Sequence, residues 1–412
     1  MKLKGKAISL IIPIFVVSLF LGSSPVAGET GVTADSILVG CSNSFSGPLV
    51  YPGTELVNYG LEIYFKHIND QGGINGRMVK TQYYDDAYSP QKAVANTIRL
   101  VEQDGVFAIL ASQGTAPVFA TIKYLGEQKV PLLFPFQGVP YEGVAAIDTA
   151  LGGKYIFTSF TSYPLQTEIV MKWLVQKKNF KRIGMIYQDD KYGYSFRDPA
   201  KKLLGDMGLD LTAAEPISRK AIDASAQVAK LKAANLDAVL LVLTPRPGGM
   251  FLKQAHKVGW TESKLISSGP LTDEKFIILA GGVGESVWGL SLWPDPVNSK
   301  MPGVVEYREI LEKYAPGHVP NRFSLYGYFY AKLFSEAARR TGKDLTRENL
   351  VKTLEKMKRW KSGIMSPVSF SPDDHKTQQD GFMAEVEGGV FKPISGWLSI
   401  KDGKLKERRY KE

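Results

Sequence analysis

The fold is decided by the stretch ILVGCS at residues 37–42, a short apolar run typical of a strand buried in a parallel sheet. A polar loop follows at residues 43–52, and residues 54–69 then carry apolar and aromatic side chains at helical spacing. Glycines within 72–76 end this helix, and a second strand is predicted at residues 78–84. A strand, a helix and a strand in this order predict parallel strands joined by a right-handed crossover.

The same alternation runs through most of the chain and restarts once. Further strands are predicted at residues 106–110, 130–134, 155–159, 182–187, 211–214, 238–243, 264–267 and 287–292. Helices are predicted between most of them, including 165–176 and 249–258, and a later helix is predicted at 325–341. The elements after residue 159 repeat the order of the first set, and 412 residues exceed what one hydrophobic core normally organises. The sequence therefore predicts an α/β fold of two similar, Rossmann-like lobes.

The N-terminus has the features of a secretory signal peptide. Three lysines precede an almost continuous apolar run at residues 7–21, and small residues follow it. A retained membrane anchor is the alternative, but a run that is interrupted by Pro13 is short for the roughly 20 residues that span a bilayer. We therefore expect residues 1–28 to be a cleaved signal and the mature protein to work in the periplasm.

The formal net charge of +10 does not by itself indicate a nucleic-acid partner, and we expect none. Three of the positive charges lie in the predicted signal, which leaves +7, and most of the other Lys and Arg residues are scattered over predicted helix surfaces. The single cysteine, Cys41, has no partner for an internal disulfide. It also lies too far beyond the apolar run for a lipid attachment site, so we expect it to end a buried strand.

Signatures of catalysis and of metal binding are weak or absent. No G-x-x-x-x-G-K-[ST], H-E-x-x-H or G-x-S-x-G motif occurs, and no G-x-G-x-x-G follows the first strand. The four histidines are isolated and lack the spacing of metal ligands. The acidic pairs at 85–86 and 189–190 each end a strand. For aspartates at such positions, capping a turn is a simpler explanation than acid catalysis. We predict no catalytic residue, no metal and no cofactor.

Candidate ligand-binding residues lie in the loops after the strands, because ligands of open parallel sheets sit outside the carboxyl ends of the strands. The loop Ser112-Gln113-Gly114-Thr115 stands directly before a predicted helix. Hydroxyl groups and free backbone N–H groups at a helix start form an anion site. Ordinary capping of the helix by Ser or Thr is the alternative interpretation.

Three groups of residues resemble the motifs of one family. They are Ser46-Gly47-Pro48, the segment 68–76 (INDQGGING), and Asp85-Asp86 with the helix that starts at Ser89-Pro90. Together they are similar to the branched-chain amino-acid-binding (Leu/Ile/Val) family of type I periplasmic binding proteins, which serve ABC importers. The resemblance covers roughly residues 35–400.

The resemblance implies that a solute is enclosed between two lobes that three crossovers join. The crossovers are expected near residues 158–159, 290–292 and 365–367. The first lobe would then comprise residues 32–158 and 292–366, and the second lobe residues 159–291 and 367–412.

The resemblance also implies binding residues. Ser112 matches the serine that receives the ligand carboxylate, and Thr115 matches the neighbouring hydroxyl group. The segment after the fourth strand matches at Phe136, Gln137 and Gly138. In the second lobe Tyr192, which precedes a glycine, matches a tyrosine that contacts the ligand.

The sequence departs from the family pattern after Gly269-Pro270. Amino-acid binders of the family place an acidic residue there for the ligand's ammonium group, whereas this chain has Leu271, with Asp273 two residues later. Because a buried ammonium without an anionic partner is costly, either Asp273 or Glu274 takes over, or the ligand carries no α-amino group. We favour an aromatic or aliphatic carboxylic acid or a related polar solute. Tyr51 and Arg246 are further candidates for lining its site.

We therefore expect a monomeric binding protein that delivers an amino acid or a related small carboxylate to an ABC permease in the membrane. A ligand-sensing receptor domain of the same fold is the first alternative, and a neighbouring permease or ATPase gene would separate the two. An exported α/β enzyme is the second alternative, for which turnover would be the test.

Overall fold

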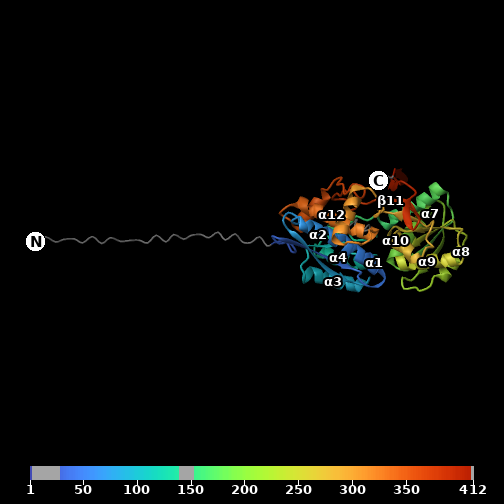
Figure 1. Cartoon of the computed structure of the whole chain (residues 1–412), viewed down its shortest axis with the longest axis horizontal. Coiled ribbons are helices and arrows are strands. Elements are labelled where there is room, and N and C mark those ends of the chain that lie inside the picture. Colours follow the sequence, from blue (N-terminus) through green and yellow to red (C-terminus); the bar gives the residue numbers. More distant parts are fainter. Residues whose placement is uncertain (2–27, 139–152, 410–412) are drawn as a thin grey trace.

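The computed structural model describes residue 1, residues 28–138 and residues 153–409. Almost all of the predicted signal peptide therefore lies outside the described residues. Figure 1 shows two lobes side by side, one formed largely by the first and the late-middle parts of the chain and the other by its centre. The two parallel-sheet lobes predicted from the sequence are confirmed.

The first lobe is built on a five-stranded, fully parallel sheet with the strand order β2-β1-β3-β4-β5. Its strands are β1 (Ser36–Asn43), β2 (Met78–Asp85), β3 (Ala108–Leu110), β4 (Leu132–Leu133) and β5 (Ile156–Phe157). Alternate residues face opposite layers of helices: Ile109 packs with one hydrophobic cluster and Leu110 with another. Cys41 is fully buried in β1, as predicted.

Two layers of helices cover the first sheet. On one face lie α3 (Pro90–Glu102) and α4 (Thr115–Glu127). The other layer comprises α1 (Val50–Leu56), the π-helical segment η2 (Val57–Leu61), α2 (Glu62–Asp70), α11 (Pro302–Tyr314), α12 (Arg322–Thr341) and α13 (Arg347–Glu355). In Figure 1 α12 lies beside α2, although more than 250 residues separate them in the sequence.

The contact of α12 with η2 depends on two glycines. A Cβ on Gly327 would lie 1.8 Å from the carbonyl oxygen of Leu56, and a Cβ on Gly60 would lie 2.6 Å from the Cα of Gly327. The two backbones therefore meet directly, and no larger residue fits at either position without displacing a helix.

The second lobe is built on a nine-stranded mixed sheet whose main order is β14-β13-β11-β10-β9-β8-β6-β7, with β12 paired to β11. Its parallel strands are β6 (Ile183–Gln188), β7 (Leu211–Ile217), β8 (Ala238–Val242), β9 (Lys264–Ser267) and β10 (Trp288–Ser291). The antiparallel strands are β11 (Asp380–Glu387), β12 (Val390–Pro393), β13 (Trp397–Lys401) and β14 (Lys404–Arg408).

The helices of the second lobe also form two layers. The first contains α6 (Tyr163–Lys172), its π-helical continuation η5 (Trp173–Lys177) and α7 (Lys191–Asp206), whose apolar residues belong to the same cluster as the first lobe's core. The second contains α8 (Ser225–Ala233), α9 (Pro245–Lys257) and α10 (Glu274–Ala280), around a separate cluster.

Three segments connect the sheets, after β5, after β10 and before β11. The third connection still packs on the first lobe near its end: the His375 ring stacks on Phe157 at 3.9 Å, and Thr158 forms a bridge with Lys376. We therefore propose that the chain returns to the second lobe between Lys376 and Asp380, later than the boundary at 366/367 that we expected from the sequence.

Candidate functional site

A small cavity of about 40 Å³ lies between the two lobes. Its lining comes from segments that follow the carboxyl ends of strands in both sheets, where ligands of parallel sheets bind. The lining residues are Leu49, Pro52, Tyr88, Gln113, Gly114, Thr115, Phe136, Tyr163, Tyr192, Leu243, Thr244, Pro245, Pro270 and Phe323. Such a volume holds about three water molecules, so a solute of amino-acid size requires the lobes to move apart.

The first-lobe wall is the uncapped start of α4. Gly114 occupies the N-cap position with φ of 95° and offers no side-chain acceptor to the helix. A Cβ at Gly114 would lie 2.6 Å from the Tyr88 ring, so glycine is required both by the backbone angle and by the space. The first backbone N–H groups of α4 have no carbonyl partner within the helix, and the positive end of the helix dipole lies at the cavity.

The second-lobe wall includes two buried tyrosines. Tyr163 begins α6, and its hydroxyl group lies 3.3 Å from Oγ1 of Thr115 in the first lobe. Tyr192 lies in the first turn of α7, where the Asp190 carboxylate accepts its backbone N–H at 2.9 Å, and its hydroxyl group lies 2.9 Å from Oγ of Ser268. Burial raises the pKa of Tyr163 to about 12, so its hydroxyl group keeps its proton and remains able to donate a hydrogen bond.

Among residues 28–138 and 153–409, no charged side chain lines the cavity. Five of its residues are aromatic, and Phe136 packs edge to face against Phe323 at 5.5 Å. Oε1 of Gln113 is buried and has no hydrogen-bond partner. The lining residues that the structure describes therefore offer hydroxyl groups, helix N–H groups and one unpaired amide acceptor among aromatic rings, and none of them offers a carboxylate for an ammonium group.

The structure brings three of the ten predicted site residues into the cavity lining: Thr115, Phe136 and Tyr192. Ser112, Gln137 and Gly138 are adjacent in the chain to lining residues or lie close behind them. Ser112 is 6% exposed, and its carbonyl accepts the Phe136 amide at 2.8 Å. Gln137 is buried, and the carbonyl of Gly138 accepts the Tyr163 amide at 2.5 Å.

The other four predicted residues lie outside the lining. Leu271 is fully buried in the cluster around α9 and α10, where it packs beside Gly248. Arg246 lies in the first turn of α9 and lines a separate surface hollow with Met250 and Lys253, because the helix begins at Pro245 and turns this side chain away. Tyr51 packs its ring against Phe323 at 5.7 Å.

Asp273, the fourth of these residues, caps α10. Its Oδ1 accepts the backbone N–H of Lys275 at 2.8 Å, and its side chain is 1% exposed. Burial, with a smaller contribution from Glu274, raises its pKa to about 7. Asp273 does not line the cavity. The residue that the sequence suggested as a partner for a ligand ammonium group therefore caps a helix instead.

Tyr88, Gln113, Tyr163, Thr244 and Phe323 line the cavity but were not among the predicted residues. Gln113 lies within a loop that the sequence did single out, between two residues that were assigned. Tyr163 and Phe323 lie in the first turns of helices that were predicted to start at residues 165 and 325, two and three residues too late, so no sequence pattern placed these side chains at the site.

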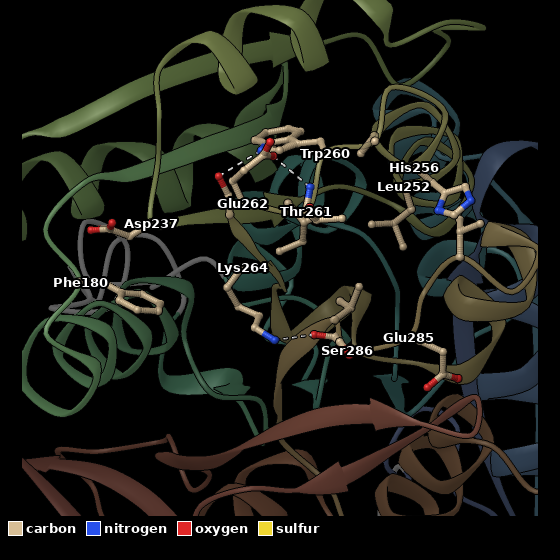
Figure 2. Close-up of a pocket in the computed structure, with 16 residues that line it drawn as sticks. Phe180, Asp237, Leu252, His256, Trp260, Thr261, Glu262, Lys264, Glu285 and Ser286 are labelled. Carbon is tan, nitrogen blue, oxygen red and sulfur yellow. Dashed lines mark hydrogen bonds between the residues drawn. The ribbon is translucent and has the colours of Figure 1, made fainter.

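A larger hollow of about 710 Å³ lies elsewhere on the second lobe. Figure 2 shows Asp237, Lys264 and Ser286 on its walls, and these residues lie at or before the amino ends of strands β8, β9 and β10. Nζ of Lys264 donates to the carbonyl of Ser286 at 3.1 Å. Because it lies at the opposite edge of the sheet from the interlobe cavity, we do not assign the solute to it.

Within residues 28–138 and 153–409, no cluster of three or more His, Cys, Asp or Glu side chains has the arrangement of a metal site. None of the helices described there is both long enough and apolar enough to cross a membrane.

Comparisons with known proteins agree with this geometry. A family model described as periplasmic binding protein matches residues 36–390. The chain is 28% identical over 331 residues to the Leu/Ile/Val-binding protein homolog 7 of Brucella abortus (strain 2308), covering 76% of this chain and 78% of the relative.

Two solved structures show the same fold. One is a branched-chain amino acid ABC transporter protein from Thermus thermophilus with bound valine, with a TM-score of 0.81 at 19% identity, covering 89% of this chain and 97% of the other. The other is a fatty acid ABC transporter substrate-binding protein from Thermomonospora curvata, with a TM-score of 0.77 at 22% identity, covering 89% and 93%.

Proposed function

The chain belongs to the periplasmic binding protein family, and from this premise we propose that it captures a small carboxylate between its lobes for an ABC importer. The observation that carries the proposal is the uncharged interlobe cavity at the uncapped start of α4. We place this step in the periplasm, where a membrane permease would receive the loaded protein.

The first lobe would bind the carboxylate. Helix N–H groups and the Thr115 hydroxyl group are donors at the positive end of a helix dipole, which favours an anion. Ser112, directly behind the lining, would come within reach once the ligand widens the cavity. The second lobe would then close by a hinge motion and place Tyr163 and Tyr192 against the remainder of the ligand.

The ligand would lack an α-amino group. No carboxylate from the described part of the chain lines the cavity, and Asp273 is engaged as a helix cap. Enclosing an ammonium group without an anionic partner would cost several kcal/mol. The aromatic lining fits the hydrocarbon part of an aromatic or branched aliphatic acid.

A thermal-shift screen with matched pairs tests both parts of the proposal. The pairs are 3-phenylpropionate against phenylalanine and 4-methylpentanoate against leucine, each with the same carbon skeleton. A ligand that binds only the folded protein raises the melting temperature by mass action, so we expect the acids to raise it and the amino acids to leave it unchanged. A shift by the amino acids alone would refute the absence of an ammonium group, and no shift by any carboxylate would refute carboxylate capture.

A further inference from the structure

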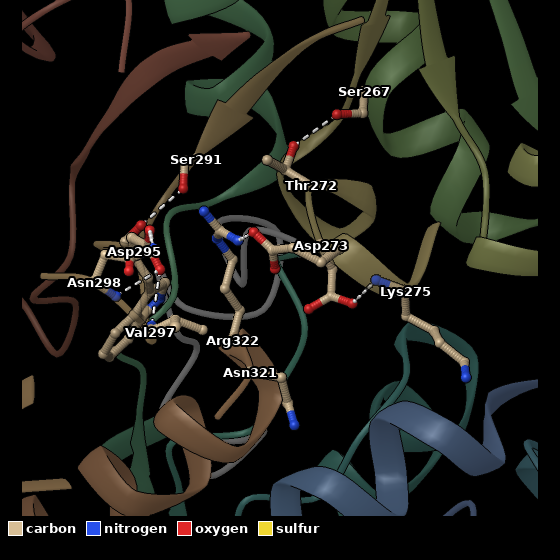
Figure 3. Close-up of polar contacts among 12 residues, drawn as sticks. Ser267, Thr272, Asp273, Lys275, Ser291, Asp295, Val297, Asn298, Asn321 and Arg322 are labelled. Carbon is tan, nitrogen blue, oxygen red and sulfur yellow. Dashed lines mark hydrogen bonds and ion pairs between the residues drawn. The ribbon is translucent and has the colours of Figure 1, made fainter. Parts of the chain in front are cut away.

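A buried charge cluster lies between the lobes, beside the cavity but outside its lining. Arg322, the first residue of α12 in the first lobe, is 3% exposed and forms an ion pair with Glu274, the first residue of α10 in the second lobe. Asp273 lies next to Glu274. Figure 3 shows the Arg322 side chain between the segment that carries Asp273 and the segment that carries Asp295.

The charges of this cluster depend on one another. Burial alone would lower the pKa of Arg322, but the carboxylates of Glu274, Asp273 and Asp295 outweigh burial and raise it. Asp295 is itself occupied by the backbone amides of Val297 and Asn298. Arg322 is therefore a buried cation whose direct partner is the partly buried Glu274 carboxylate, with Asp273 and Asp295 nearby.

The bonding within the cluster is incomplete. Nε and Nη2 of Arg322, Oε2 of Glu274 and Oδ2 of Asp273 are buried without a hydrogen-bond partner. Separation of the lobes would expose all of these atoms to water, which could form hydrogen bonds with them. The attraction within the ion pair therefore has to offset the cost of keeping these atoms away from water. Removal of either partner would leave an unpaired buried charge, which only separation of the lobes could return to water.

The cluster is also linked along the chain to the cavity. Arg322 precedes Phe323, which lines the cavity, and Pro270, four residues before Glu274, lines it from the other lobe. Two other interlobe contacts of charged side chains lie nearer to the surface: Lys191 is exposed and lies 3.3 Å from the centre of the Phe119 ring, and Arg219 is only partly buried where it contacts Tyr88.

We infer that Arg322 is a positioning residue for ligand capture, and that its ion pair with Glu274 is a latch that holds the two lobes closed in one register. The inference rests on the proposed function, because it presumes that the lobes open and close around a solute. It assigns Arg322 no contact with that solute.

The test measures the separation of the lobes directly. Nitroxide labels are placed at Lys123→Cys on α4 and Lys202→Cys on α7, both highly exposed positions in opposite lobes. The native Cys41 is fully buried, and burial raises its pKa to about 12, so it resists labelling. Electron-spin distance distributions are compared between the otherwise unchanged protein and latch variants.

We expect a short-distance population in the parent protein and at least a fivefold loss of it in Glu274→Gln and in Arg322→Met. The double variant should lose less than either single variant, because no unpaired charge is then buried. The exchanged pair, Arg322→Glu with Glu274→Arg, should recover part of the population. Glu385→Gln, which breaks the Lys264–Glu385 pair within the second lobe, is the matched control and should change nothing.

Unchanged distributions in both single variants would overturn the latch, as would a parent protein without the short-distance population. Far-ultraviolet circular dichroism identifies a variant that fails to fold, and Glu274→Asp then replaces that variant. The short-distance population of Glu274→Asp should be smaller than that of the parent protein and larger than that expected for Glu274→Gln. The ligand screen and the distance measurement fail independently. Unchanged distance distributions in the latch variants together with the expected melting shifts would refute this inference alone. Missing melting shifts together with the expected loss of the short-distance population would refute the proposed carboxylate ligand alone.

Discussion

The hydroxyl group of Thr115 lies 3.3 Å from the hydroxyl group of Tyr163, and this hydrogen bond joins the two lobes across the interlobe cavity. Thr115 starts α4 in the first lobe and Tyr163 starts α6 in the second. A carboxylate arriving at the start of α4 would take the place of one hydroxyl group as the partner of the other. Under the proposed function, ligand binding and lobe closure would therefore use the same two groups.

Replacement of Thr115 by alanine should weaken binding of the ligand at least tenfold. A hydrogen bond to a charged group contributes about 1.5 kcal/mol or more, and water does not replace it in a closed cavity. Calorimetric titration with the acid that gives the largest melting shift measures the effect. Thr121→Ala is the control, because Thr121 is equally buried in α4 but bonds only to the carbonyl of Val118. Equal affinities for both variants would contradict the assignment of Thr115.

Replacement of Gly114 by alanine should abolish binding and lower the stability of the fold. The new Cβ would meet the Tyr88 ring at 2.6 Å, and the backbone angle of 95° disfavours any side chain. Overpacking of this kind costs about 2 kcal/mol. Chemical denaturation measures the loss. Gly205→Ala is the control, since a Cβ there meets nothing within 4 Å and replaces a helical glycine. A Gly114→Ala protein with unchanged stability and affinity would contradict the requirement for glycine at the start of α4.

The unpartnered Oε1 of Gln113 predicts a preference for acids that carry a hydroxyl group. A ligand O–H would satisfy this buried acceptor, which otherwise costs about 1–3 kcal/mol. We expect 3-(4-hydroxyphenyl)propionate or a positional isomer to bind more tightly than 3-phenylpropionate. In Gln113→Met that difference should disappear while the parent acid retains its affinity. An unchanged difference in the variant would assign the preference to another group.

The raised pKa of Asp273 predicts that the melting temperature falls as the pH rises through about 7. Burial and Glu274 raise this pKa from 3.8 in the open chain to about 7, while Arg322 and the Lys275 amide oppose the rise and Glu55 adds to it. The folded protein therefore binds a proton that the unfolded chain releases between these values. The resulting stability is complete below about pH 3.8 and is lost as the pH rises through 7.

Differential scanning fluorimetry between pH 5.5 and 8.5 measures this slope. Asp273→Asn is uncharged at every pH and should flatten the curve, whereas Asp295→Asn should leave the slope in place. A curve that is equally steep in Asp273→Asn would assign the pH dependence to other groups.

The sequence predicted the ten parallel strands well because most of them are short apolar runs between polar loops, but it gave no ranges for the four antiparallel strands from β11 to β14. The range 264–267 agrees with β9 residue for residue, and 37–42 falls inside β1. Helix starts were predicted less well. Residues 249–258 were expected as a helix that in fact begins at Pro245, because its first turn carries proline and arginine and lacks the apolar spacing of its body.

The late prediction of helix starts explains why several residues that line the cavity were not predicted. A residue in a first helical turn is aimed by the helix, so Arg246 turns to the surface while its neighbour Pro245 lines the cavity. The pairing of Arg322 with Glu274 joins positions 48 residues apart in different lobes. Local patterns in the sequence carry no information about such a contact, which only the closed arrangement creates.

The direct backbone contact between Gly60 and Gly327 has a consequence for how the chain reaches its native state. One face of the first sheet is finished only by a helix that is synthesised some 180 residues after the last strand of that sheet. The second sheet likewise waits for strands near the C-terminus. Neither sheet is complete until these late segments have been synthesised, and contacts of such long range slow folding. If the chain is exported as proposed, slow folding would help it to pass through a translocation channel before it folds.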